Sequence, residues 1–130
     1  MKKYFIFIIG LFLVVFMSLY CFAASPAGEQ LELSGKLENG IRSIEVKALR
    51  YKFEPDPIVV RLGEKVRLIV TSIDVAHGLA IPEFNVKLSI PAAKTEHIEF
   101  IADKQGEFQA YCSVYCGPGH GHMHASFIVK

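Results

Sequence analysis

Apolar and polar residues alternate along most of the chain after residue 43, in short segments separated by turn-forming residues. In segment 65–73, for example, Val66, Leu68 and Val70 occupy every second position. Successive side chains of a β-strand point to opposite faces, so this period of two predicts strands with one buried face. Alternation, or a short run of β-branched residues, predicts further strands at 44–49, 58–60, 95–102, 107–112 and 125–129.

No segment after residue 25 shows the sustained 3.6-residue period of an amphipathic helix. Roughly six to eight short strands with regular turn signals favour an all-β sandwich or barrel. Segment 25–42 is polar and contains several glycines, so we interpret it as a linker with a short strand at 31–33. We therefore assign residues 43–130 to one β-domain.

An apolar run without a charged side chain extends from Tyr4 to Ala24, directly after Lys2 and Lys3. About 20 apolar residues can span the hydrocarbon core of a membrane as a helix. We expect segment 1–24 to be an uncleaved, single-pass transmembrane helix, with a cleaved signal peptide as the alternative. The two lysines favour a cytoplasmic N-terminus, so the β-domain should face the outside in both cases. A cleaved form would be periplasmic or secreted.

The charge and the cysteine count of the chain exclude two classes of protein. The 130 residues carry a net charge of +1, and without the first 24 residues 12 basic side chains face 13 acidic ones. Binding of nucleic acid requires a basic surface that neutralises phosphates, and none is evident, so we expect no nucleic-acid partner. The chain has three cysteines, one of them in the apolar run, which does not suggest a disulfide framework.

A cluster of possible metal ligands lies in the loop between the last two predicted strands. Cys112, Cys116, His120 and Met123 follow one another there, among three glycines and a proline. Thiolate, imidazole and thioether are ligands that together suit copper. An upstream histidine, His77, follows the predicted strand 65–73, and in a sandwich both loops can lie at the same end.

The number of thiols favours a site with two metals. A mononuclear blue-copper site uses one Cys, two His and a weak axial Met, so the loop offers one thiolate too many. Two thiolates can bridge two copper ions, each with one His. Two other uses of the cysteines remain: a structural zinc site completed by His77, His122 or His124, and a metal-free Cys112–Cys116 disulfide.

With this spacing, Cys-x3-Cys-x3-His-x2-Met, the loop resembles the CuA loop of cytochrome c oxidase subunit II. The resemblance covers roughly 44–130, including the segments 53–58 and 74–78 and the ending 127–129. It implies a cupredoxin-like Greek-key β-sandwich with a mixed-valence dicopper centre. Cys112 and Cys116 would bridge both ions, His77 and Met123 would bind one, and His120 with the backbone carbonyl of Val114 would bind the other.

Three departures from the family modify this expectation. Many members have an acid at the position of Val114 that helps to bind magnesium, so we expect no magnesium site here. Many have two N-terminal helices, whereas this chain has at most one and resembles the short second subunits of B-type heme–copper oxidases. The chain has no Trp, which many members use for electron entry. Tyr51 and Phe53 are our candidates for that surface.

The resemblance implies an electron-transfer subunit that is not catalytic alone. It would accept electrons from cytochrome c or a small blue-copper protein and pass them to heme in a separate oxidase catalytic subunit. The alternatives are a free-standing periplasmic CuA carrier or copper-delivery protein, and an electron-input module of a denitrifying reductase. Of the other histidines, we expect His97 to be an exposed strand residue, and His122 and His124 to lie beside the site without binding the metals.

Overall fold

The structure is a computed structural model that describes residues 31–130. The apolar segment 1–24, expected to be an anchor or signal peptide, lies outside the described residues. Within residues 31–130, no helix has the length and apolar character needed to cross a membrane.

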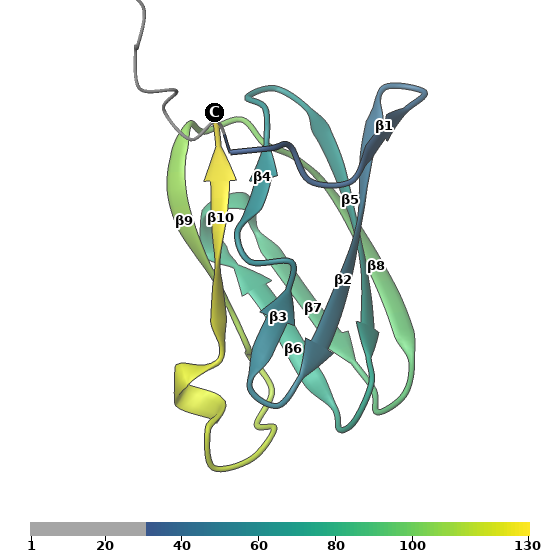
Figure 1. Ribbon diagram of the computed structural model, residues 1–130, viewed down its shortest axis with the longest axis vertical. Coiled ribbons are helices and arrows are strands. Elements are labelled where there is room, and N and C mark those ends of the chain that lie inside the picture. Colours follow the sequence, from purple (N-terminus) through teal and green to yellow (C-terminus); the bar gives the residue numbers. More distant parts are fainter. Residues whose placement is uncertain (1–30) are drawn as a thin grey trace, which may run out of the picture. The chain divides into compact units, whose positions relative to one another are not determined.

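Two five-stranded sheets pack face to face (Figure 1). The first has the order β1-β2-β5-β8, with β3 paired to β2. Its strands are β1 Lys36–Glu38, β2 Ile41–Leu49, β3 Lys52–Glu54, β5 Lys65–Ser72 and β8 Thr95–Ile101. The second has the order β4-β10-β9-β6-β7, formed by β4 Ile58–Val60, β6 His77–Ile81, β7 Val86–Ile90, β9 Gly106–Tyr111 and β10 His124–Val129. Two 3-10 turns, η1 Pro82–Phe84 and η2 His120–His122, complete the described part of the chain. The predicted all-β sandwich is confirmed.

The buried faces are those that the alternation predicted. In β2 the side chains of Ile44, Val46 and Ala48 are buried, and the same holds for alternate residues of the parallel neighbour β5. Aromatic rings fill the space between the sheets around Phe84, whose centroid lies 5.0 Å from that of Phe108 and 5.4 Å from that of Phe127. Both pairs have the edge-to-face geometry that aromatic rings prefer.

Strands β1, β3, β6 and β7 were not predicted, and for three of them the reason is local. β1 and β3 each contain three residues, too few for a visible period. All five residues of β6 are buried, so polar and apolar positions do not alternate there. The strand expected at 31–33 is absent; β1 and the start of β2 lie instead within the range expected to be a linker.

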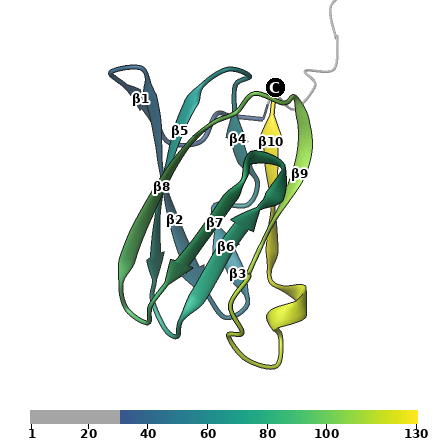
Figure 2. The ribbon, with the colours of Figure 1, turned by 180° about the vertical axis from the view of Figure 1, so that it is seen from behind.

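Three of the connections between strands that lie at one end of the sandwich, the lower end in Figure 1 and, seen from behind, in Figure 2, are close to the predicted ligands. They are the β2–β3 turn, the β5–β6 turn and the long β9–β10 connection that contains η2. The described chain begins at the opposite end, close to the C-terminus. The packing of the two sheets therefore holds loops that are distant in sequence at a common end.

The opposite end is held by hydrogen bonds and one ion pair. Ser34 exchanges hydrogen bonds with the backbone of Val59, accepting with its hydroxyl and donating with its own N–H. Arg42 donates to both carboxylate oxygens of Glu64, over 2.5 Å and 2.8 Å, and to the carbonyl of Ser34. Only 7% of the Arg42 side chain and 13% of the Glu64 side chain are exposed. The hydrogen bonds from Arg42 hold the pKa of Glu64 below its ordinary value against the opposing effect of burial.

Glu64→Gln should lower the free energy of unfolding at neutral pH by about 2 kcal/mol, because a buried guanidinium loses its charged partner. The lowered pKa of Glu64 means that the folded chain binds this proton less tightly than the unfolded chain. The stabilisation is therefore present above the ordinary carboxyl pKa and lost as pH falls through the lowered value. Chemical unfolding at several pH values measures both effects, with the exposed Glu99→Gln as control. An equal loss in the two variants would contradict the account.

Candidate metal centre

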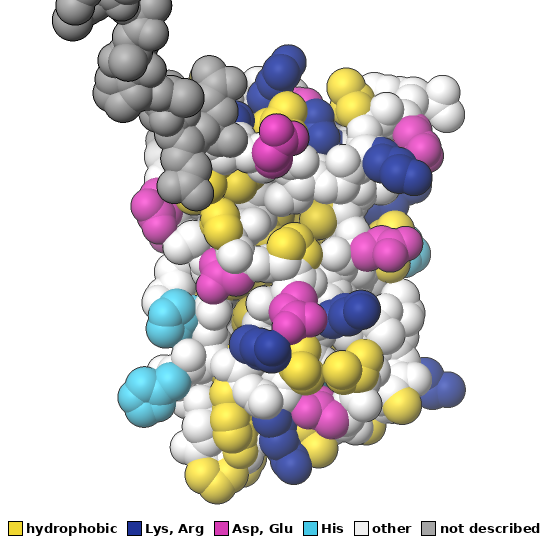
Figure 3. All heavy atoms as spheres, in the orientation of Figure 1, with side chains coloured by type: hydrophobic (Ala, Val, Ile, Leu, Met, Phe, Trp, Pro, Cys, Tyr) yellow, Lys and Arg dark blue, Asp and Glu magenta, His cyan; other side chains and the backbone are white. Residues whose placement is uncertain are grey.

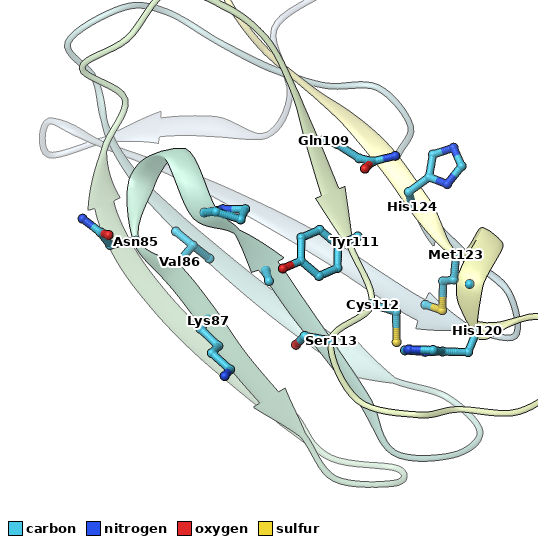
Figure 4. Close-up of a pocket in the computed structure, with 13 residues that line it drawn as sticks. Asn85, Val86, Lys87, Gln109, Tyr111, Cys112, Ser113, His120, Met123 and His124 are labelled. Carbon is cyan, nitrogen blue, oxygen red and sulfur yellow. The ribbon is translucent and has the colours of Figure 1, made fainter.

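Five side chains predicted as ligands meet at the end of the sandwich where the three connections lie. His77 is the first residue of β6, Cys112 follows β9, and Cys116 lies in the β9–β10 connection. His120 begins η2 and Met123 follows it directly. His77, Cys112, Cys116 and Met123 are at most 4% exposed, whereas His120 is half-buried. Figure 4 shows Cys112, His120 and Met123 pointing toward one another.

Two sulfur atoms lie at the centre of this cluster. Cys112 Sγ and Cys116 Sγ are 3.6 Å apart, and both cysteines are free thiols. Cys112 Sγ lies 3.8 Å from His77 Nδ1 and 3.1 Å from the carbonyl oxygen of Val114. Cys116 Sγ lies 3.7 Å from both His120 Nδ1 and Met123 Sδ. The two histidines thus approach different sulfurs.

The donor atoms of His77, Cys112 and Cys116 all lie within 4.8 Å of one another, close enough to share a metal ion. His120 and Met123 join this group through Cys116. The donors are two sulfurs of thiols, one thioether, two imidazole nitrogens and a carbonyl oxygen. Such a set fits copper better than the hard cations, which prefer oxygen.

The imidazole of His77 is held in one orientation by Asp74. Its Nε2 atom is 2.6 Å from Asp74 Oδ1, so the N–H at this position donates to the carboxylate and leaves Nδ1 to face the sulfur. Burial alone would raise the pKa of Asp74, but hydrogen bonds from the Arg50 backbone, the His77 ring and the Val75 backbone hold it below its ordinary value. A carboxylate behind a ligating histidine fixes the ring and increases its basicity.

The thiol of Cys116 is protonated in the absence of a cation. Burial and the neighbouring Cys112 raise the pKa of the Cys116 thiol to about 11. The thiolate is the form that binds metals, so metal binding at this site must release protons. Two ionised sulfurs in this buried position require positive charge between them.

Backbone hydrogen bonds within the β9–β10 connection give it a defined shape. The Cys112 N–H donates to the Met123 carbonyl, and the His120 N–H donates to that of Gly117. The ring of Tyr51, from the β2–β3 turn, covers Gly117 and Gly119 so closely that a Cβ atom on either glycine would overlap it. These glycines therefore let the loop lie flat against Tyr51.

The histidines that were expected to lie outside the metal site are on the surface. His97, His122 and His124 are exposed, as expected. In Figure 4 His124 lies beside Gln109, on the rim of a groove of about 890 Å³, and points away from Cys112. Histidines stand on the surface near this end in Figure 3.

The suggestion that Phe53 forms an exposed surface for electron entry is wrong, because its side chain is 1% exposed and packs in the core. Tyr51 is half-buried beneath the loop. Sequence reasoning did not identify Asp74 and Arg50 as neighbours of the site. An acid three residues before the histidine was the one available signal for Asp74, and Arg50 had none.

Gly119→Ala should lower the free energy of unfolding by about 2 kcal/mol, because the new methyl group would enter the Tyr51 ring. The matched control is Gly121→Ala, two residues away, where a Cβ atom meets nothing within 4 Å. Chemical unfolding of both variants provides the comparison. Equal stabilities would show that Tyr51 does not pack on this loop.

The chain matches the model of the family described as "Cytochrome C oxidase subunit II, periplasmic domain" over residues 38–129. It is 28% identical over 88 residues to cytochrome c oxidase subunit 2 of Thermus thermophilus, covering 68% of this chain and 65% of that protein. It is also 31% identical over 102 residues to the nitrous-oxide reductase of Cupriavidus necator, covering 75% of this chain and 16% of the reductase. The chain thus spans less than two thirds of the length of either relative.

Among solved structures, the periplasmic domain of subunit II of cytochrome oxidase from Bradyrhizobium japonicum is similar, with a TM-score of 0.65 and 22% identity. The alignment covers 73% of this chain and 88% of that domain. This likeness shows the fold, an all-β, cupredoxin-like sandwich. Because the family model spans most of the chain, and the matched range includes every donor residue described above, the chain belongs to the cytochrome c oxidase subunit II family.

Proposed function

We propose that this chain binds two copper ions in a CuA-type centre and relays electrons as the second subunit of a heme–copper terminal oxidase. The observation that carries the proposal is the pair of buried sulfurs 3.6 Å apart, each approached by a different histidine. One copper ion would leave a thiolate and an imidazole without a metal. Two ions use all the donors, with Cys112 and Cys116 as bridges.

The side chains at the ends of the centre complete the proposed ligand set. His77 and Met123 would bind one ion, and His120 with the carbonyl of Val114 would bind the other. Two copper ions that share bridging thiolates can hold a single delocalised electron, which suits transfer without bond chemistry. The protein supplies a rigid and largely dry surrounding, because four of the five side chains are almost fully buried. Little reorganisation is then needed when the charge changes.

The half-buried edge of His120 offers a route between the centre and a partner. Its ring lies 5.7 Å from that of Tyr115, which is 73% exposed. Apolar side chains reach the surface at this end (Figure 3), as expected where another protein docks. The proposed partners are cytochrome c or a small blue-copper protein as donor, and a heme-containing catalytic subunit as acceptor.

The family is that of a periplasmic domain, which agrees with a β-domain outside the cytoplasmic membrane. We propose that the N-terminal segment keeps the domain at the membrane as a single-pass anchor. A free-standing CuA carrier or copper-delivery protein is the second candidate. An electron-input module is the third, and the likeness to a nitrous-oxide reductase favours it over other reductases. Intact N-terminal residues in membrane-purified protein, together with a copurifying heme subunit, would support the oxidase over both.

Cys112→Ser and Cys116→Ser should each abolish the two-copper spectrum, because either change removes a shared thiolate. Copper analysis and absorption spectra after copper loading measure the effect. Ser113→Ala, a neighbouring change in the same loop, is the control and should keep both metals. A cysteine variant that retained the wild-type spectrum would refute the bridging assignment.

Met123→Leu should retain both copper ions and raise the reduction potential, because a weak axial donor to the oxidised metal is lost. The exchange conserves volume, so the cost in stability should stay below about 1.5 kcal/mol. Redox titration with parallel copper analysis tests this. Loss of all copper would show that Met123 is an essential ligand, contrary to the assignment.

A further inference from the structure

Arg50 connects the metal loop to the rest of the sandwich, although no sequence motif marks it. The residue follows β2 and is exposed. Its Nε atom donates to the backbone carbonyl of Cys116 over 2.9 Å, across a separation of 66 residues. Its backbone N–H donates to Asp74 Oδ2 over 2.8 Å. Arg50 therefore touches the backbone of one cysteine and the carboxylate that orients His77.

Asp74 extends this connection to the histidine side of the centre. Its other oxygen, Oδ1, lies 2.6 Å from His77 Nε2 and accepts a hydrogen bond from the Val75 backbone over 2.7 Å. The path Cys116–Arg50–Asp74–His77 thus joins the β9–β10 connection to the β5–β6 turn. The adjoining Tyr51 ring covers Gly117 and Gly119 on the same side. The two loops that carry the ligands are held together through a single turn.

The charge of Arg50 has a separate consequence. A guanidinium remains ionised at every relevant pH, so this cation is permanent. Its hydrogen bond to the Cys116 carbonyl keeps it beside the centre. A nearby positive charge favours the state with one more electron. Because Arg50 is exposed, salt should screen part of this effect.

We propose that Arg50 is a positioning residue of the copper centre: its hydrogen bonds clamp the cysteine loop to the His77 turn, and its charge stabilises the reduced state. The role of the charge rests on the proposed copper-binding function. The clamp is a property of the metal-free chain as well, so the two parts can be tested separately.

Three variants of the whole chain, purified in detergent, separate charge from hydrogen-bond geometry. Arg50→Gln removes the charge, and Arg50→Lys keeps the charge but replaces the planar donor. Lys52→Gln is the matched control, because this neighbouring exposed cation pairs with Glu54 at 2.6 Å. The first measurement is the reduction potential of the copper-loaded protein at low and high salt. The second is amide hydrogen exchange of His120, His122 and Met123 in metal-free protein, since these N–H groups are bonded within the loop.

Arg50→Gln should lower the equilibrium constant for electron uptake about threefold at low salt, and less at high salt. Arg50→Lys, which keeps the charge, should change the potential less than Arg50→Gln does. Both Arg50 variants should speed amide hydrogen exchange in the β9–β10 connection about fivefold, the effect of losing one hydrogen bond. Lys52→Gln should change neither the potential nor the exchange rate.

Equal potentials in Arg50→Gln and Lys52→Gln would overturn the role of the charge, and unchanged hydrogen exchange in the Arg50 variants would overturn the clamp. Failure of the wild-type chain to bind two copper ions would refute the proposed function, while the exchange data would still decide the clamp.

Discussion

Two sulfur atoms buried 3.6 Å apart are the constraint on which the rest of the site depends. As thiols they are stable in this position, since burial raises the pKa of Cys116. As thiolates they repel each other and need positive charge between them. The surrounding residues meet that need in a specific way: one imidazole approaches each sulfur, a thioether and a carbonyl oxygen lie nearby, and little water has access. The site is therefore organised for a cation that prefers sulfur and nitrogen.

The sandwich contributes by keeping three distant loops in a fixed relation. At one end, the Arg42–Glu64 pair and the Ser34 hydrogen bonds tie the start of the described chain to β4 and β5. At the other end, the turns after β2 and β5 support the β9–β10 connection. Asp74, Arg50 and Tyr51 carry this support, and each belongs to a turn between strands of the core. A rigid core with loops fixed at one end would suit the proposed electron transfer, because the donor side chains would move little.

Local patterns predicted much of this arrangement. Alternation revealed the buried faces of β2 and β5 and the half-buried face of β8, because a two-residue period is a direct consequence of strand geometry. The spacing of Cys112, Cys116, His120 and Met123 predicted that these side chains would gather, since all four lie within one connection. His77 was singled out from the expectation that loops of a sandwich share an end, and the resemblance to a known family gave it a ligand role.

The parts that could not be predicted depend on contacts between distant segments. Burial of every residue in β6 hides its period, and β3 is too short to show one. Phe53 was expected at the surface, but its aromatic side chain lies in the core. The hydrogen bond from Arg50 to Cys116 spans 66 residues, and nothing near Arg50 in the sequence indicates it. Loop support of this kind becomes visible only when the sheets are assembled.

The central claim is that the site binds two copper ions and that they share one delocalised electron. The most direct measurement is copper analysis together with the electron paramagnetic resonance spectrum of the copper-loaded chain. We predict two copper ions per chain and one unpaired electron delocalised over two equivalent nuclei. One copper ion with a single-nucleus signal, or zinc with no signal, would contradict the account and leave a mononuclear or structural site on the same fold.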